Sequence, residues 1–142
     1  MPITLWLLAG LLAQQPAPSS TSSSLDFEVF TKQVQPIFLE RRQGFTRCVV
    51  CRSEGNVVFL QPLSPGAATW TEEQSRLNFA TVSKLVTPGE PLKSKLLLHP
   101  LEPAAGGDEF HNGGRQFTSQ NDPRFQAIAA WVRGRTAGGS GK

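Results

Sequence analysis

The stretch Cys48-Val49-Val50-Cys51-Arg52 decides how the rest of the chain is interpreted, because it places two thiols three positions apart. Two thiols at this spacing can add to the two vinyl groups of a haem, form a redox disulfide, or supply half of a zinc site. A disulfide between them would close too small a loop to staple a fold. The motif is ambiguous by itself, so the surrounding sequence has to decide among these chemistries.

A helix is predicted before the motif. Asp26 is a good N-cap, and Pro36 is expected to bend or end the helix near Gln35. Apolar residues recur from Asp26 onward at three- and four-residue spacing: Phe27, Phe30, Val34 and Ile37.

Two further helical segments are predicted after the motif. Thr71 and Gln74 form a capping-box pattern, and the helix that they begin should run to Val86, where Thr87-Pro88-Gly89 stops it. Ser94 is expected to cap one more short helical turn, which Pro100 ends.

The last helix has the clearest boundaries, with Asp122 at the N-cap, Pro123 at the first helical position and Gly134 as the stop signal. Its predicted core face consists of Phe125, Ile128, Ala129 and Val132.

The long connections are rich in Gly and Pro, and the only strand-like stretch is Asn56–Leu60. The pattern therefore predicts a mostly α fold with long Gly/Pro-rich loops. Such loops in a small domain are usually functional or wrapped around something, and a buried prosthetic group would complete the core.

The N-terminal residues predict export. Ile3–Ala13 is an apolar run too short to span a bilayer, so residues 1–17 are interpreted as a signal peptide and residues 18–24 as a Ser/Pro-rich linker. The expected location is the periplasm or the extracellular space, with no stable membrane span. Since no Lys or Arg precedes the apolar run, a short uncleaved anchor is the alternative. The predicted domain covers residues 25–134, followed by a disordered tail, 135–142.

Charge and length narrow the function classes further. The chain of 142 residues has a formal charge of only +3, and its basic residues are spread along the sequence rather than gathered in a stripe. Nucleic acid is therefore not implied as a partner. One domain with one core fits this length.

An ordered set of segments gives the motif its context, and it covers about residues 25–134: Val34–Phe38 (VQPIF), Cys48–Arg52 (CVVCR), Val86–Leu96 (VTPGEPLKSKL), Gly106–Gly114 and Ile128–Val132 (IAAWV). The set resembles the cytochrome c-like domains, most closely the short planctomycete-type haem domains. The resemblance implies a small helical domain with haem c, and hence iron, attached covalently to Cys48 and Cys51. It also implies an electron carrier rather than an enzyme, whose redox partner protein is unknown.

Arg52 departs from the pattern of that family. The family has the iron-ligating histidine at this position, and a guanidinium has no lone pair to replace an imidazole. Its attachment machinery also looks for this histidine. Arg52 is expected at an exposed loop position, where it either pairs with a haem propionate or is solvated.

The other axial ligand has two candidates. In the family it is a Met or His in the loop before the last helix, but the only methionine here is Met1, in the predicted signal. Glycines around His111 would let the backbone approach a flat macrocycle, so His111 is the preferred iron ligand. His99 is the reserve candidate, and with Arg52 in place ligation by both histidines together is the alternative.

Three other interpretations remain open. The first is a haem-less descendant of the same fold that acts as an interaction module. The second is a dithiol oxidoreductase, which needs C-x-x-C at the start of a helix after a β-strand, whereas helix and loop are predicted before Cys48. The third is zinc bound by Cys48, Cys51, His99 and His111, although the histidines lie much farther apart than in zinc fingers.

Overall fold

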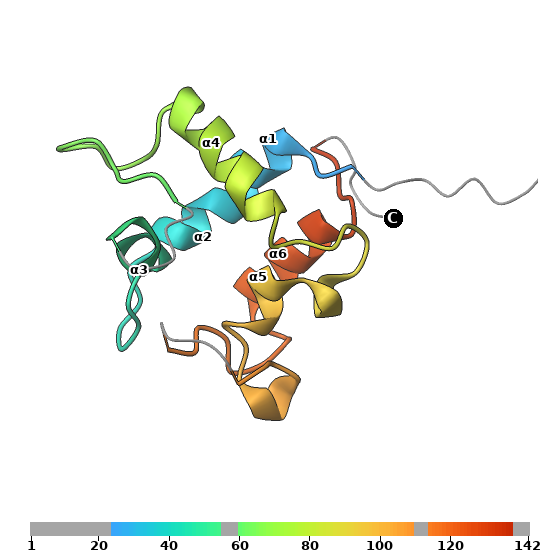
Figure 1. The fold of residues 1–142 in the computed structure, drawn as a ribbon. Coiled ribbons are helices and arrows are strands. Elements are labelled where there is room, and N and C mark those ends of the chain that lie inside the picture. Colours follow the sequence, from blue (N-terminus) through green and yellow to red (C-terminus); the bar gives the residue numbers. More distant parts are fainter. Residues whose placement is uncertain (1–23, 55–59, 110–113, 138–142) are drawn as a thin grey trace, which may run out of the picture.

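The computed structural model describes residues 24–54, 60–109 and 114–137, and among these residues it contains helices and no strand (Figure 1). The mostly α fold class with long loops is thus confirmed for this part of the chain. The predicted signal peptide, the linker up to residue 23, most of the strand-like stretch and the tail beyond residue 137 lie outside the described residues. The elements in chain order are α1 (Phe27–Val29), the π-helix η1 (Phe30–Val34), α2 (Gln35–Leu39), α3 (Cys48–Glu54), α4 (Glu72–Ser83), α5 (Lys95–Leu98) and α6 (Pro123–Val132), with 3₁₀ turns at Pro91–Lys93 and Pro103–Ala105.

Pro36 was predicted to bend or end the first helix near Gln35, and the helical run does not end there, because it continues through Pro36. Asp26 caps the run as predicted, since its side chain accepts a hydrogen bond from the backbone of Val29. One turn then widens into η1, where the N–H of Gln35 donates to the carbonyl of Phe30. Pro36 lies in the first turn of α2, where its missing N–H costs little. The run therefore reaches Leu39.

The two middle helices match the prediction in part. The capping box of α4 is present, because Thr71 and Gln74 exchange backbone-to-side-chain hydrogen bonds of 3.0 and 3.2 Å. This helix ends at Ser83 rather than at Val86. Ser94 is the N-cap residue of α5 as predicted, but its side chain makes no capping hydrogen bond. Its hydroxyl instead accepts a hydrogen bond from Thr87 N at 2.9 Å and thereby holds the preceding loop.

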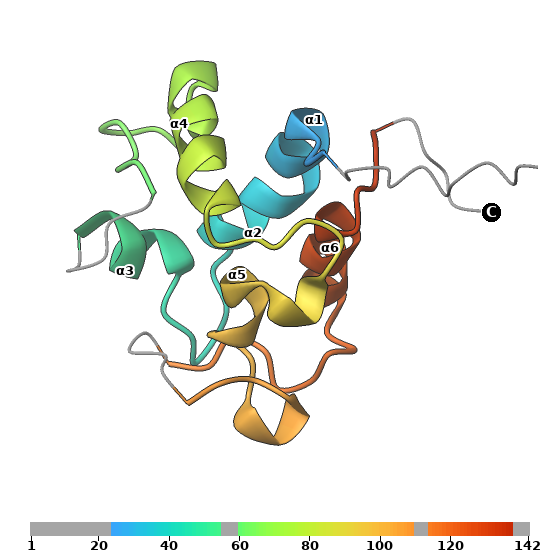
Figure 2. The ribbon, with the colours of Figure 1, turned by 45° about the vertical axis from the view of Figure 1, so that its right-hand side comes forward.

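Helix α6 lies beside the η1 run, and Figures 1 and 2 show the two segments next to each other from both directions. The predicted cap is confirmed, because Asp122 accepts a hydrogen bond from Arg124 N at 2.8 Å. Trp131 is completely buried, with its ring centroid 5.3 Å from that of Phe30. Its indole N–H donates to the Asp26 carbonyl at 2.9 Å, so this contact joins the two ends of the described chain.

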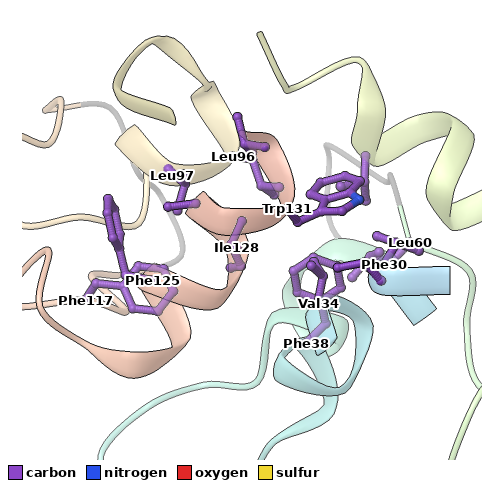
Figure 3. Close-up of a cluster of buried hydrophobic side chains, with 14 of the residues drawn as sticks. Phe30, Val34, Phe38, Leu60, Leu96, Leu97, Phe117, Phe125, Ile128 and Trp131 are labelled. Atoms are coloured by element: carbon purple, nitrogen blue, oxygen red, sulfur yellow. The ribbon is translucent and has the colours of Figure 1, made fainter. Parts of the chain in front are cut away.

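The core is one hydrophobic cluster, to which the first helical run and helices α3, α4, α5 and α6 all contribute buried side chains (Figure 3). Burying each large side chain contributes about 1.5–3 kcal/mol before entropy is counted. The predicted core residues of α6 all belong to it. Its members are Val29, Phe30, Val34, Phe38, Val49, Leu60, Trp70, Val82, Leu96, Leu97, Leu101, Phe117, Phe125, Ile128, Ala129, Trp131 and Val132.

Candidate functional site

The C-x-x-C motif begins helix α3. Cys48 is half-buried and packs against the core cluster, next to the buried Val49. Positions 48 and 51 lie on the same face of the helix, because residues three apart are neighbours on a helical surface.

Arg52 belongs to the same helix, and the expectation of an exposed loop position is wrong. The residue is half-buried. Its carbonyl accepts a hydrogen bond from Leu60 N at 3.2 Å, which ties the end of α3 to a buried core residue. The reason is that the chain turns helical at Cys48 itself, so position 52 falls in the second helical turn.

The start of α3 also bears on the dithiol alternative. The motif does lie at the beginning of a helix, as a dithiol oxidoreductase would require. The preceding segment contains only an isolated bridge between Arg42 and Phe45, and no strand occurs in the described ranges. The structure thus meets one of the two requirements.

His99 is the C-cap residue of α5. Its Nδ1 lies 2.5 Å from Oδ2 of Asp108, and the side chains of the pair are 32% and 30% exposed. Asp108 itself is held beside the helix end, because its backbone N–H donates to Leu98 O at 3.2 Å. The preferred ligand candidate, His111, lies outside the described residues.

Arg115 holds the backbone around His99 from the other direction. One guanidinium nitrogen donates to the carbonyls of His99 and Leu101, at 2.8 and 3.0 Å. Arg115 therefore holds the backbone of the His99 segment at two carbonyls, and Asp108 holds the imidazole of His99. The sequence pattern pointed to neither Asp108 nor Arg115.

Gln116 links the His99 segment to the C-x-x-C segment. Its side chain is buried and donates to Thr46 O at 3.1 Å, two residues before Cys48. Its backbone N–H donates to Pro100 O at 2.8 Å, one residue after His99. Two segments more than fifty residues apart in sequence thus meet at one glutamine. Sequence reasoning missed Gln116, because a single glutamine in a loop carries no recognisable signal.

Ion pairs fasten the segment before α3 to the start of α6. Arg124 donates to both carboxylate oxygens of Glu40. This hydrogen bonding lowers the pKa of Glu40 below its ordinary value and raises the pKa of Arg124. Arg42 lies 3.7 Å from Asp122 and also donates to Gln116 O at 2.7 Å. Glu40 and Arg42, in the segment before α3, are thereby held in position by the start of α6 and by the backbone of Gln116.

No cluster of three or more His, Cys, Asp or Glu side chains close enough to hold a metal ion occurs within the described ranges. The zinc alternative lies partly outside them, since it needs His111 and the side chain of Cys51. A separate groove of about 810 Å³ lies between the α1–α2 run and residues 68–75. None of the predicted site residues lines this groove.

The described part of the chain contains no helix that is both long enough and apolar enough to cross a membrane.

Comparison of the chain with protein-family models, with curated proteins and with solved structures finds no match. The resemblance to cytochrome c-like domains therefore rests on the order of the sequence segments alone.

Proposed function

We propose that this domain is an exported electron carrier that holds one haem covalently through Cys48 and Cys51. The observation that carries the proposal is the Gln116 bridge, because it brings the thiol segment and a histidine segment together. A c-type site needs both: thiols to attach the haem and nitrogen to ligate its iron.

The types of donor among the described residues support the proposal. Positions 48 and 51 share a helix face, as two thioethers to one macrocycle require. His99 offers a ring nitrogen whose companion nitrogen contacts a carboxylate, and metal-ligating histidines usually have such a partner. Arg52 offers no lone pair, so the iron ligands come from His99 and His111.

The bound haem would supply one-electron chemistry, with no substrate reaction by side chains. Cys48 and Cys51 would hold it. Cys48 packs against the hydrophobic core, and hydrogen bonds of Arg124 and Gln116 hold the segment before α3 in position. Arg52 is half-buried on the thiol helix, where its charge can pair with a haem propionate.

Covalent attachment can be tested by acid-acetone extraction after expression of the full chain with a c-type maturation system. The parent protein should keep its Soret absorption after extraction, and a double variant, Cys48→Ser with Cys51→Ser, should lose it. The spectrum should also lack the charge-transfer band of a methionine-ligated haem, since the only methionine is Met1. A colourless parent protein would contradict the proposal.

Arg52 favours a second candidate, a haem-less interaction module on the same fold. The side chain at the ligand position cannot bind iron, whatever the rest of the domain retains. This candidate predicts a folded, colourless protein after maturation. The extraction experiment therefore separates the two functions.

A further inference from the structure

We propose that Asp108 is a positioning residue that holds His99 so that its Nε2 is the nitrogen presented to iron. This inference rests on the proposed function. Nδ1 of His99 lies 2.5 Å from Oδ2 of Asp108. An ionised carboxylate only accepts hydrogen bonds, so the proton of a neutral imidazole lies on Nδ1. The lone pair is then on Nε2, which is the nitrogen that can bind a metal.

The loop between the two residues is built to bring Asp108 back to the end of α5. Gly107 N donates to Glu102 O at 3.0 Å, and the next N–H, that of Asp108, donates to Leu98 O at 3.2 Å. A Cβ at position 107 would lie 1.9 Å from Leu101 O, a distance that only a backbone shift could relieve. The close approach therefore requires glycine, and it places the carboxylate beside the imidazole.

Among the described residues, the backbone of His99 is held while its side chain stays partly exposed. Arg115 donates to His99 O at 2.8 Å, on the main chain rather than on the ring. The His99 side chain is 32% exposed, so the packing around it does not bury it. Fixed backbone, fixed tautomer and an accessible ring are the conditions for a preorganised metal ligand.

The carboxylate should also influence the bound iron. A carboxylate partner raises the basicity of a ligating imidazole, and replacing such partners typically costs 10–100-fold in metal affinity. A more basic ligand favours ferric over ferrous iron. Removing the charge of Asp108 should therefore weaken this preference about tenfold, which corresponds to a rise of about 59 mV in a one-electron reduction potential.

The test uses the full chain and two independent measurements. In haem-free protein, nitrogen NMR of the imidazole should show the Nδ1–H tautomer in the parent and a mixture of tautomers in Asp108→Asn. In haem-loaded protein, Asp108→Asn should raise the reduction potential and alter the low-spin EPR signature, whereas Asp108→Glu should restore both. The matched control is Glu109→Gln, which removes the same charge from the neighbouring residue and should change neither measurement.

The outcomes separate this inference from the proposed function. A protein that carries haem but has the same potential in the parent and in Asp108→Asn would overturn the role of Asp108 and leave the proposed function standing. An Nε2–H tautomer in the haem-free parent would overturn it as well. Mature protein without haem would overturn the proposed function, and this inference with it. The tautomer of the haem-free parent is measured without any substitution, so it tests the inference even if Asp108→Asn fails to fold.

Discussion

Replacing Gln116 with leucine should weaken the link between the thiol segment and the His99 segment while keeping most of the side-chain volume. The change removes the hydrogen bond from the Gln116 amide to Thr46 O, and the backbone hydrogen bonds of Gln116 with Pro100 O and with the Arg42 guanidinium stay. The net contribution of one such bond is about 0.5–1.5 kcal/mol. Since Thr46 is exposed, water can replace the lost donor, and we expect a loss of about 1 kcal/mol in the free energy of unfolding. The same free energy corresponds to about a fivefold lower equilibrium ratio of the joined to the separated arrangement.

Urea unfolding followed by circular dichroism measures the stability, and the intact mass of the matured protein measures haem occupancy. Gln120→Leu is the matched control, because the Gln120 amide also donates to a loop carbonyl, that of Ala105, at 2.7 Å. Both variants should lose similar stability, but only Gln116→Leu should lose haem. Equal haem occupancy in the two variants would refute the role that we assign to Gln116.

Three further predictions concern the core, the acid range and the missing ligand. Trp131→Ala should lower the free energy of unfolding by about 3–5 kcal/mol, because the side chain is completely buried; a loss below about 1 kcal/mol in urea unfolding would contradict its place in the core. The hydrogen bonds from Arg124 lower the pKa of Glu40, so their stabilisation should be complete at neutral pH and disappear as the pH falls below about 4.3. Because this pair is partly exposed, the effect should stay below about 1 kcal/mol, and Glu40→Gln should flatten that part of the stability–pH curve. Arg52→His should increase haem occupancy and give a low-spin, two-histidine spectrum, at a helix-propensity cost of about 0.5 kcal/mol; a folded variant with no added haem would favour the haem-less module.

The starts of the first helical run, α4 and α6 were predictable because capping is local chemistry. The N-caps of the first and last helical segments, Asp26 and Asp122, bond to residues within three positions, and so does the capping box at Thr71. A helix end near Pro36, one of the two predicted outcomes, does not occur for a physical reason. A widened π turn lets the helical run continue past it, and local sequence does not specify that turn.

The candidate site was predictable only in its reactive side chains. Cys48 and His99 stand out by residue type, whereas Gln116 acts on a backbone carbonyl 70 positions away. Asp108 lies only nine positions from His99, but its role depends on a loop that folds back tightly at Gly107. Contacts of this kind follow from the tertiary fold and have no periodic pattern in the sequence.

The most direct test of the central claim is the intact mass, under denaturing conditions, of the unaltered chain matured with a c-type attachment system. Denaturation removes any haem that is bound without a covalent link. We predict the mass of the polypeptide plus one haem, and the mass of the bare polypeptide after both cysteines are replaced with serine. A bare polypeptide mass for the unaltered, folded protein would contradict the claim that Cys48 and Cys51 carry haem.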